Sequence, residues 1–209
     1  MKKFPAFNAK EFKIFQKIKT PSKIQDFVEN IPINFELEGD TYFSPLMILK
    51  ENKAHCVEGA MLAAAILWHH GQKPFLMDFE TIAEDESHVV ALFRQNGCWG
   101  AISKTNHAVL RYRDPVYKTP RELAMSYFNE YFLDSGLKTL RRFSAPFDLS
   151  KRPDEWLVSD KSLSYVVDEL IESPHFQIAD ARGIKTLRLA EPIEIESTKL
   201  TRWKKVADK

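Results

Sequence analysis

The sequence predicts an α+β fold in which one buried helix packs on an antiparallel sheet, with further helices before and after. Residues 57–70 are apolar around nearly the whole circumference of a helix, which is typical of a helix buried on all sides. Three short runs rich in aromatic or β-branched residues then follow one another at 74–80, 88–95 and 98–103. Strands that cluster in the sequence, instead of alternating with helices, favour an antiparallel sheet.

Helices before the buried one are marked by their first residues. Thr20–Pro21 and Ser44–Pro45 each put a capping side chain in front of a proline, which favours a helix start. Apolar residues continue the first of these helices at helical spacing: Ile24, Phe27, Val28 and Ile31. A shorter helix is expected nearer the amino end, from the spacing of Phe12, Phe15 and Ile18.

The strand region contains a clear turn signal. Asn96–Gly97 separates the last two strand-like runs and predicts a hairpin with a type I′ turn. A further strand is expected at 108–113, stopped by Asp114–Pro115. The tail at 185–203 is expected to form one or two strands around Pro192.

Helices are also expected after the strands. Thr119–Pro120, with Glu122 at the third helical position, forms a capping box. The helix that it opens carries apolar and aromatic residues, which we interpret as core packing: Leu123, Tyr127, Phe128, Tyr131 and Phe132. A last helix at 163–171 ends before Ser173–Pro174.

The length of 209 residues suits one domain, or a domain with an appended part. Residues 135–160 contain scattered glycine and proline and are expected to connect two parts. The expected division is a core at 1–135, with its amino-terminal helices, and a C-terminal extension at 136–209 that packs on it; a single domain is the alternative.

Composition excludes several classes of partner. Lys and Arg number 30 against 29 Asp and Glu, so the net charge of +1 makes no electrostatic case for nucleic acid or an anionic membrane. No window approaches the roughly 18 apolar residues of a membrane span. The first residues lack the apolar stretch of a signal peptide, and two cysteines make no disulfide framework. A reducing cytoplasm, where a free thiol persists, is the expected location.

Cys56 lies at the start of the buried helix, where free N–H groups and the positive end of the helix dipole favour a thiolate. A cysteine taken alone more often simply packs, and Cys98 is assigned such a structural role. His88 opens the strand that follows an acidic loop, and a histidine on a neighbouring strand is the usual partner of such a thiol. The side chain of His55 is expected to diverge from its neighbour.

Metal and cofactor sites are not expected. His69–His70 are consecutive on a helix and point about 100° apart, and no HExxH or CxxC spacing occurs. The sequence also lacks a phosphate loop and a dinucleotide fingerprint, so no cofactor is implied.

Together these residues resemble a known family. The order of three features resembles the transglutaminase-like superfamily, which includes bacterial cysteine peptidase-like proteins. These features are Cys56 at the start of an alanine-rich helix, His88 at the start of "HVVALF", and Trp99 in "CWGAIS" after a turn. The resemblance covers roughly 45–105, and the flanks look like a distinct bacterial subgroup. It implies a papain-like core in which Cys56 is the nucleophile, His88 is the general base and acid, and an aspartate orients the histidine.

The sequence departs from the family at the third position, where Ser103 stands in place of the aspartate. A hydroxyl accepts a bond from the histidine but cannot stabilise an imidazolium as a carboxylate does. Asn106 is the first candidate to replace the missing group, as in Cys–His–Asn peptidases, and Asp78 on the preceding strand is the second. Asp85 or Glu86, in the loop before His88, is a third possibility.

Two functions remain open at this point. The first is acyl transfer or hydrolysis through a Cys56 thiolate, acting on a peptide, a protein or a small amide or thioester; water as acceptor makes the protein a peptidase or amidase, and an amine makes it a transferase. The second, motivated by Ser103, is a catalytically degenerate binding module of the same fold. A scaffold protein that uses aromatic residues of the C-terminal third is a weaker third class.

Overall fold

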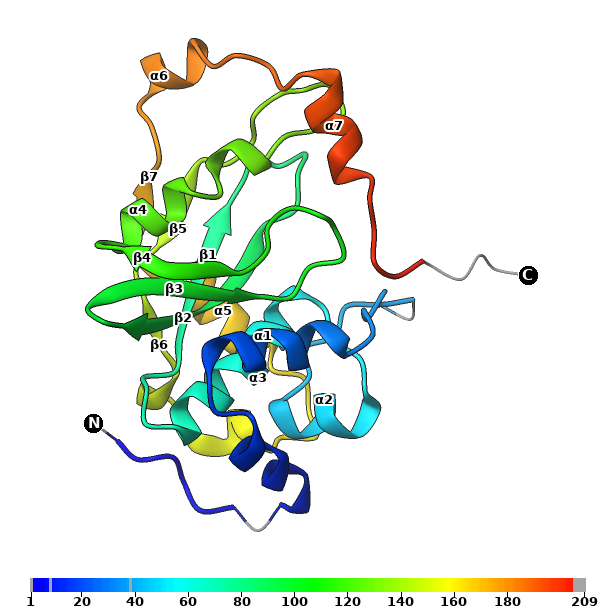
Figure 1. The fold of residues 1–209 in the computed structure, drawn as a ribbon, viewed down its shortest axis with the longest axis vertical. Coiled ribbons are helices and arrows are strands. Elements are labelled where there is room, and N and C mark those ends of the chain that lie inside the picture. The colour runs from blue at the N-terminus through cyan, green and yellow to red at the C-terminus, as the bar shows by residue number, and fades with distance from the viewer. Residues whose placement is uncertain (1, 8, 38, 205–209) are drawn as a thin grey trace.

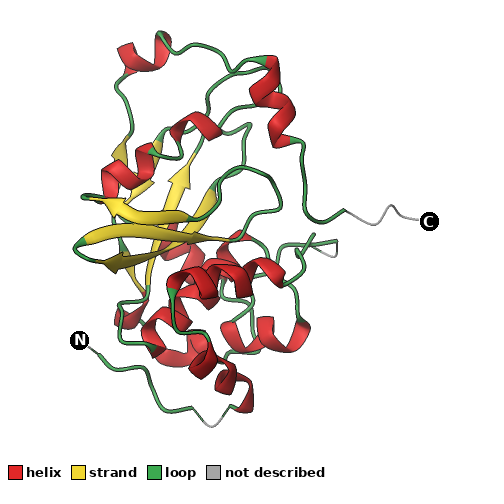
Figure 2. Ribbon diagram, viewed as in Figure 1, coloured by secondary structure: helices red, strands yellow, loops and turns green. Residues whose placement is uncertain are grey.

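The computed structural model describes residues 2–7, 9–37 and 39–204, and it has the predicted α+β architecture. A twisted sheet crosses the middle of the molecule, with one group of helices below it and α4 above it in Figure 1. Figure 2 shows the same division by secondary structure. The helical elements before the sheet are η1 (Lys10–Lys17), α1 (Pro21–Asn30), α2 (Pro45–Glu51) and α3 (Cys56–His69).

All strand pairs of the sheet are antiparallel. Its order is β4-β3-β2-β1-β5-β7, and β6 also pairs with β1. The strands are β1 (Phe75–Glu80), β2 (His88–Gln95), β3 (Cys98–Ser103), β4 (Arg113–Tyr117), β5 (Arg142–Ser144), β6 (Phe147–Asp148) and β7 (His175–Gln177). Because β5 pairs with β1 and β7 with β5, the C-terminal third of the chain adds strands to the same sheet as β1–β4.

The remaining helical elements follow β4. They are α4 (Pro120–Met125), η2 (Phe128–Glu130), η3 (Leu149–Lys151), η4 (Asp154–Leu157), α5 (Ser164–Ile171), α6 (Ala181–Lys185) and α7 (Pro192–Thr198). No helix among the described residues is long and apolar enough to cross a membrane.

The core lies on both faces of the sheet, and α3 is the centre of the larger part. Every residue from 57 to 68 is buried, as its apolar pattern predicts. Alternate side chains of β2 divide between the faces: Val89 and Ala91 pack toward α3, whereas Val90 and Leu92 pack toward α4. Asp78 pairs with Val89 and Phe79 pairs with His88, so the Asp78 and His88 side chains leave the sheet on opposite faces.

The predicted helix caps and the predicted hairpin turn, which depend only on neighbouring residues, are confirmed. The hydroxyls of Thr20, Ser44 and Thr119 each accept a hydrogen bond from the backbone N–H three residues on. Asn96 and Gly97 have φ of 52° and 79°, as a type I′ turn requires.

Two predicted elements are wrong. The strand expected at 108–113 is a loop, in which Leu110 has φ of 59°, and β4 instead runs through Asp114–Pro115. The proline is tolerated there because β4 is the edge strand of the sheet. The tail holds α6 and α7 and no strand around Pro192; this proline is a first helical residue, and the Glu194 carboxylate accepts the N–H of Glu191.

The helix opened by Thr119 is shorter than the aromatic stripe suggests. It ends at Met125, and the chain continues through η2 to Tyr131. Tyr127 and Tyr131 are buried all the same, against the face of the sheet that carries Phe79. Core packing therefore explains the rings of the stripe without a continuous helix.

Candidate active site

Cys56 is the first residue of α3, and its side chain is partly exposed. The helix start is held by Glu58, whose carboxylate accepts the backbone N–H of His55 at 2.9 Å. Glu58 is fully buried and also accepts hydrogen bonds from the Thr41 hydroxyl and the Phe43 N–H. The thiol is thus fixed at the positive end of a rigid, buried helix, where an anion is favoured.

His55 lies against the thiol, contrary to the expectation that it diverges. Its Nδ1 is 3.9 Å from the Cys56 Sγ, and its Nε2 is 2.7 Å from the carbonyl oxygen of Thr41. The carboxylates of Glu36 and Glu58 lie 3.5 and 3.6 Å from the same Nε2. Burial lowers the pKa of His55, but the Cys56 thiolate and the Glu58 carboxylate outweigh it and raise that pKa to about 9.

His88 is the second histidine at the thiol. It is the first residue of β2, is buried, and lines the cavity that contains the thiol. Burial raises the pKa of Cys56, whereas hydrogen bonds to His55 and His88 and their positive charge lower it, with a net result of about 6. The thiol is therefore largely ionised at neutral pH, which is the state of an effective nucleophile.

Ser103, at the end of β3, contacts the His88 ring. Its Oγ lies 2.8 Å from the His88 Nε2 and 2.5 Å from the carbonyl oxygen of Leu110. A carbonyl oxygen can only accept, so the single hydroxyl proton is donated to Leu110. Ser103 must then accept from His88 Nε2–H, which leaves the Nδ1 of neutral His88 without a proton and available as a base.

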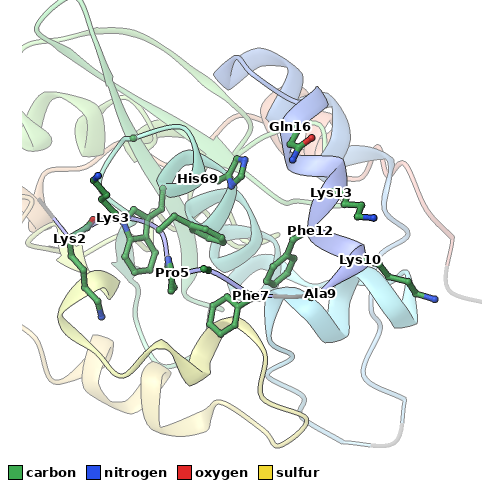
Figure 3. Close-up of a pocket in the computed structure, with 14 residues that line it drawn as sticks. Lys2, Lys3, Pro5, Phe7, Ala9, Lys10, Phe12, Lys13, Gln16 and His69 are labelled. Atoms are coloured by element: carbon green, nitrogen blue, oxygen red, sulfur yellow. Dashed lines mark hydrogen bonds between the residues drawn. The ribbon is translucent and has the colours of Figure 1, made fainter.

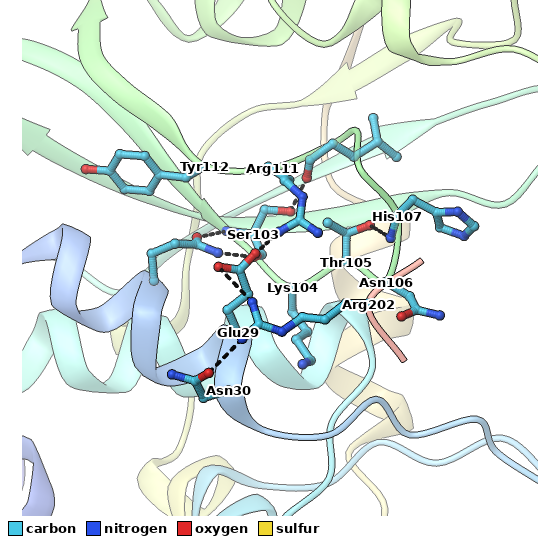
Figure 4. A network of polar contacts seen from close by, with 12 residues as sticks. Glu29, Asn30, Ser103, Lys104, Thr105, Asn106, His107, Arg111, Tyr112 and Arg202 are labelled. Atoms are coloured by element: carbon cyan, nitrogen blue, oxygen red, sulfur yellow. Dashed lines mark hydrogen bonds and ion pairs between the residues drawn. The ribbon is translucent and has the colours of Figure 1, made fainter. Parts of the chain in front are cut away.

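The main chain of Ser103 is clamped by α1. The side-chain amide of Gln25 donates to the Ser103 carbonyl oxygen at 2.8 Å and accepts its N–H at 2.9 Å. Arg111, just beyond the Leu110 turn, pairs with Glu29 of the same helix, and Arg202 of the C-terminal segment lies beside that carboxylate (Figure 4). Ser103, the hydrogen-bond acceptor of His88, is thus held by Gln25 on its main chain, and the Leu110 turn beside it is held by the Arg111–Glu29 pair.

Asn106 and Asp78, the first two candidates for the third site residue, have other partners. The Asn106 side chain donates to the carbonyl oxygen of Trp203 at 2.9 Å and accepts its N–H at 2.8 Å. Asp78 lies on the other face of the sheet from His88, and its carboxylate is 3.2 Å from His175 Nε2.

The loop before His88 holds the third possibility. The Asp85 carboxylate accepts the Thr139 hydroxyl and the backbone N–H of Glu86. Of the sequence candidates, Ser103 contacts His88, and His88 lines the same cavity as Cys56.

A cavity of about 470 Å³ opens over the thiol. Its walls come from several separate segments of the chain and are mainly polar. They include Glu36, His55, Cys56, Asp85, Glu86, His88, Lys104, Asn106, His107, Glu130 and Tyr131. Lys104 is fully buried and donates to the carbonyl oxygen of Ile31; burial, and then Arg202, lower its pKa to about 8. The thiol thus faces a chamber large enough for part of a peptide or a small acyl compound.

Sequence reasoning missed His55, Glu58 and Tyr131. A Glu three residues after a helix-capping position was the available signal for Glu58, because that spacing marks a capping box. His55 carried no signal beyond adjacency to the cysteine. Tyr131 belongs to the predicted core aromatics, and only its place in the fold reveals that it also lines the cavity.

A second, larger cavity of about 650 Å³ lies at the other end of α3, near Trp68 and His69. The amino-terminal segment covers it with aromatic side chains and exposed lysines, including Phe7, Phe12 and Lys13 (Figure 3). Fourteen residues of helix separate it from Cys56, which corresponds to about 20 Å. It is separate from the thiol site.

Comparisons with known proteins add only a distant likeness in structure. No family model matches the chain, and no curated protein matches its sequence. Among solved structures, the chain is similar to LapG of Legionella pneumophila in an EGTA-treated form, with 10% identity and a TM-score of 0.44. The match covers 77% of this chain and 86% of that one. The roles considered for Cys56 and His88 rest on the geometry of this chain alone.

Proposed function

We propose that this protein performs thiol-dependent acyl transfer or amide hydrolysis, with Cys56 as nucleophile and His88 as general base and acid. One observation carries the proposal: a cysteine at the first residue of a buried helix lies 3.9 Å from His55 and faces a cavity that His88 also lines, and both histidines lower its pKa, to about 6. The substrate class is a peptide, a protein, or a small amide or thioester.

The chemistry proceeds in two steps. The Cys56 thiolate attacks the substrate carbonyl carbon, a C–S bond forms, and the carbonyl π electrons move to the oxygen. Collapse of this tetrahedral species expels the leaving amine or thiolate, and protonated His88 supplies the proton that an amine leaving group needs. Water or an amine then attacks the acyl-enzyme, and neutral His88 takes the proton of this nucleophile. Cleavage of the C–S bond releases the acyl product and restores the Cys56 thiolate beside protonated His88.

Negative charge beside His55 supports this assignment, although Ser103 stands where the resemblance implies an aspartate. Ser103 orients His88 but is neutral, so it gives no charge stabilisation to an imidazolium. Glu36 and Glu58 stand within 3.6 Å of His55 instead. We propose that His55 holds the resting thiolate as an ion pair, while His88 exchanges the proton.

The test is the pH dependence of Cys56 alkylation by iodoacetamide. The alkylation rate should rise through a pKa of about 6 and should be abolished in Cys56→Ser. His88→Ala should raise that pKa, because one of the two hydrogen-bonding and charged partners of the thiolate is lost. A thiol pKa near 9, unchanged by His88→Ala, would reject the proposal.

Ser103 also favours a second candidate, the catalytically degenerate binding module. In that case the cavity binds its ligand without covalent chemistry, and Cys56→Ser retains ligand affinity and the biological role. Rapid alkylation of Cys56 alone does not separate the two functions, whereas formation of an acyl-enzyme detected by mass spectrometry does.

A further inference from the structure

The Tyr131 hydroxyl is a buried polar group for which the fold provides no partner. The residue is 3% exposed, and none of the described residues accepts a hydrogen bond from, or donates one to, its oxygen. An unpaired buried hydroxyl costs free energy, and buried polar groups in native proteins are nearly always satisfied. A ligand atom that accepts a hydrogen bond from this hydroxyl would satisfy it.

The position of Tyr131 indicates where that atom lies. The residue lines the cavity that contains Cys56 and His88. Its ring packs edge-on against Phe79, with centroids 6.2 Å apart, and Phe79 is paired across the sheet with His88. The Tyr131 ring therefore lies on the same face of the sheet as the proposed base, and the residue lines the same cavity.

The phenol also keeps its proton. Burial, and after it the charge of Cys56, raise the pKa of Tyr131 well above its ordinary value. A protonated phenol is a hydrogen-bond donor, and the strongest acceptor that the proposed chemistry generates is the oxyanion of the tetrahedral species.

We propose that Tyr131 donates its hydroxyl hydrogen bond to the carbonyl oxygen of the acyl substrate and to the oxyanion formed from it. This inference rests on the proposed function of Cys56. When the thiolate forms its bond to the carbonyl carbon, the displaced π electrons come to rest on an oxygen that accepts from Tyr131. The phenol remains protonated throughout, and the electrons return to the carbonyl when the leaving group departs.

Tyr131→Phe is the sharpest variant, because it removes one unpaired hydroxyl and keeps the ring. Two reactions separate its roles. Acylation by 4-nitrophenyl acetate, followed by the release of 4-nitrophenolate, passes through an oxyanion; alkylation by iodoacetamide displaces iodide and does not. Removing one oxyanion donor typically slows the chemistry by about a hundredfold or more, so acylation should fall by about that factor while the alkylation rate is unchanged.

Tyr127→Phe is the matched control. Tyr127 is buried in the same cluster, but its hydroxyl donates to the carbonyl oxygen of Arg111 at 2.9 Å. Its loss should lower the thermal midpoint and leave acylation unchanged, whereas Tyr131→Phe should leave the midpoint unchanged or raise it. A midpoint lowered more by Tyr131→Phe than by the control, or failure of that variant to fold, would show a structural role and overturn the proposal.

Failure of this inference is distinguishable from failure of the proposed function. If the wild-type protein acylates and alkylates Cys56 and Tyr131→Phe acylates equally fast, only the role of Tyr131 is rejected. If the wild-type protein releases 4-nitrophenolate no faster than Cys56→Ser does, and its alkylation rate is that of an ordinary thiol, the nucleophile is rejected and the role of Tyr131 with it.

Discussion

The Nε2 of His88 lies 2.8 Å from the Oγ of Ser103, and this contact determines which ring nitrogen can act as a base. The Ser103 proton is committed to the carbonyl oxygen of Leu110, so the serine accepts the Nε2–H and Nδ1 keeps its lone pair. A serine thus orients the ring as an aspartate would, without the charge. The Leu110 peptide is itself held, because the Glu130 carboxylate accepts its N–H at 2.6 Å.

Replacing Ser103 tests this relationship. Ser103→Ala leaves the Leu110 carbonyl without its donor and His88 without its acceptor, so we expect a loss of about 1–3 kcal/mol in the free energy of unfolding. We also expect slower acylation of Cys56, because the wrong His88 tautomer becomes accessible. Urea unfolding and 4-nitrophenyl acetate kinetics measure the two effects, with the exposed Ser22→Ala as control. Unchanged stability and kinetics would contradict the hydrogen-bond assignment.

His55 should set the pH range over which the thiolate is reactive. His55→Ala removes the group that lowers the Cys56 pKa most, so that pKa should rise from about 6 toward 9. Iodoacetamide alkylation near pH 7 should then be slower than in the wild type, and the two rates should converge above pH 9. Equal rates at pH 7 would show that His88 alone holds the thiolate.

The same ion pair should make stability depend on pH. The Cys56 pKa is depressed from 9.0 on folding, so its contribution is present above 9 and is lost as pH falls through about 6. The His55 pKa is raised from 6.5, so its contribution is present below 6.5 and is lost as pH rises through about 9. The free energy of unfolding of the wild type should therefore exceed that of His55→Ala by the largest amount between about pH 6 and pH 9. A difference independent of pH would contradict the ion pair.

Gly59 lets α3 approach the end of β3. A Cβ at this position would lie 2.4 Å from the Cβ of Lys104, next to Ser103. Gly59→Ala should therefore push the strand end away from the helix, cost about 1–3 kcal/mol by overpacking, and slow Cys56 acylation by displacing Ser103 and His88. Gly71→Ala is a suitable control: its φ of 83° makes it costly, but it lies at the far end of α3 and should leave the acylation rate unchanged.

Replacing Asn106 should loosen the C-terminal segment around Trp203 and leave the pKa of the Cys56 thiol unchanged. Both ends of its amide are bonded to the main chain of Trp203. Asn106→Ala should speed amide hydrogen exchange around Trp203 and leave the Cys56 alkylation pKa at about 6. A raised thiol pKa in Asn106→Ala would restore this residue as a partner of His88.

The sequence by itself determined the elements whose causes are local. The buried helix, the Asn96–Gly97 turn and the capped helix starts depend on residues within one or two turns of each other, and they lie where the sequence predicts. Side chains alternate between the two faces along each strand, and this alternation can be read from the sequence. Placing Asp78 and His88 on opposite faces also requires the register of β1 against β2, which only the structure gives.

Only the tertiary structure decided what surrounds the thiol. Ser103, Leu110 and Tyr131 come from separate segments, and their relation to Cys56 and His88 depends on how the loop after β3 turns back and where the chain leaves η2. Propensities and spacing carry no information about such long-range contacts, because their free energy comes from packing and from hydrogen bonds between distant residues. The sequence thus located the cysteine and the histidine that we propose as nucleophile and base, and the fold decided which groups surround them.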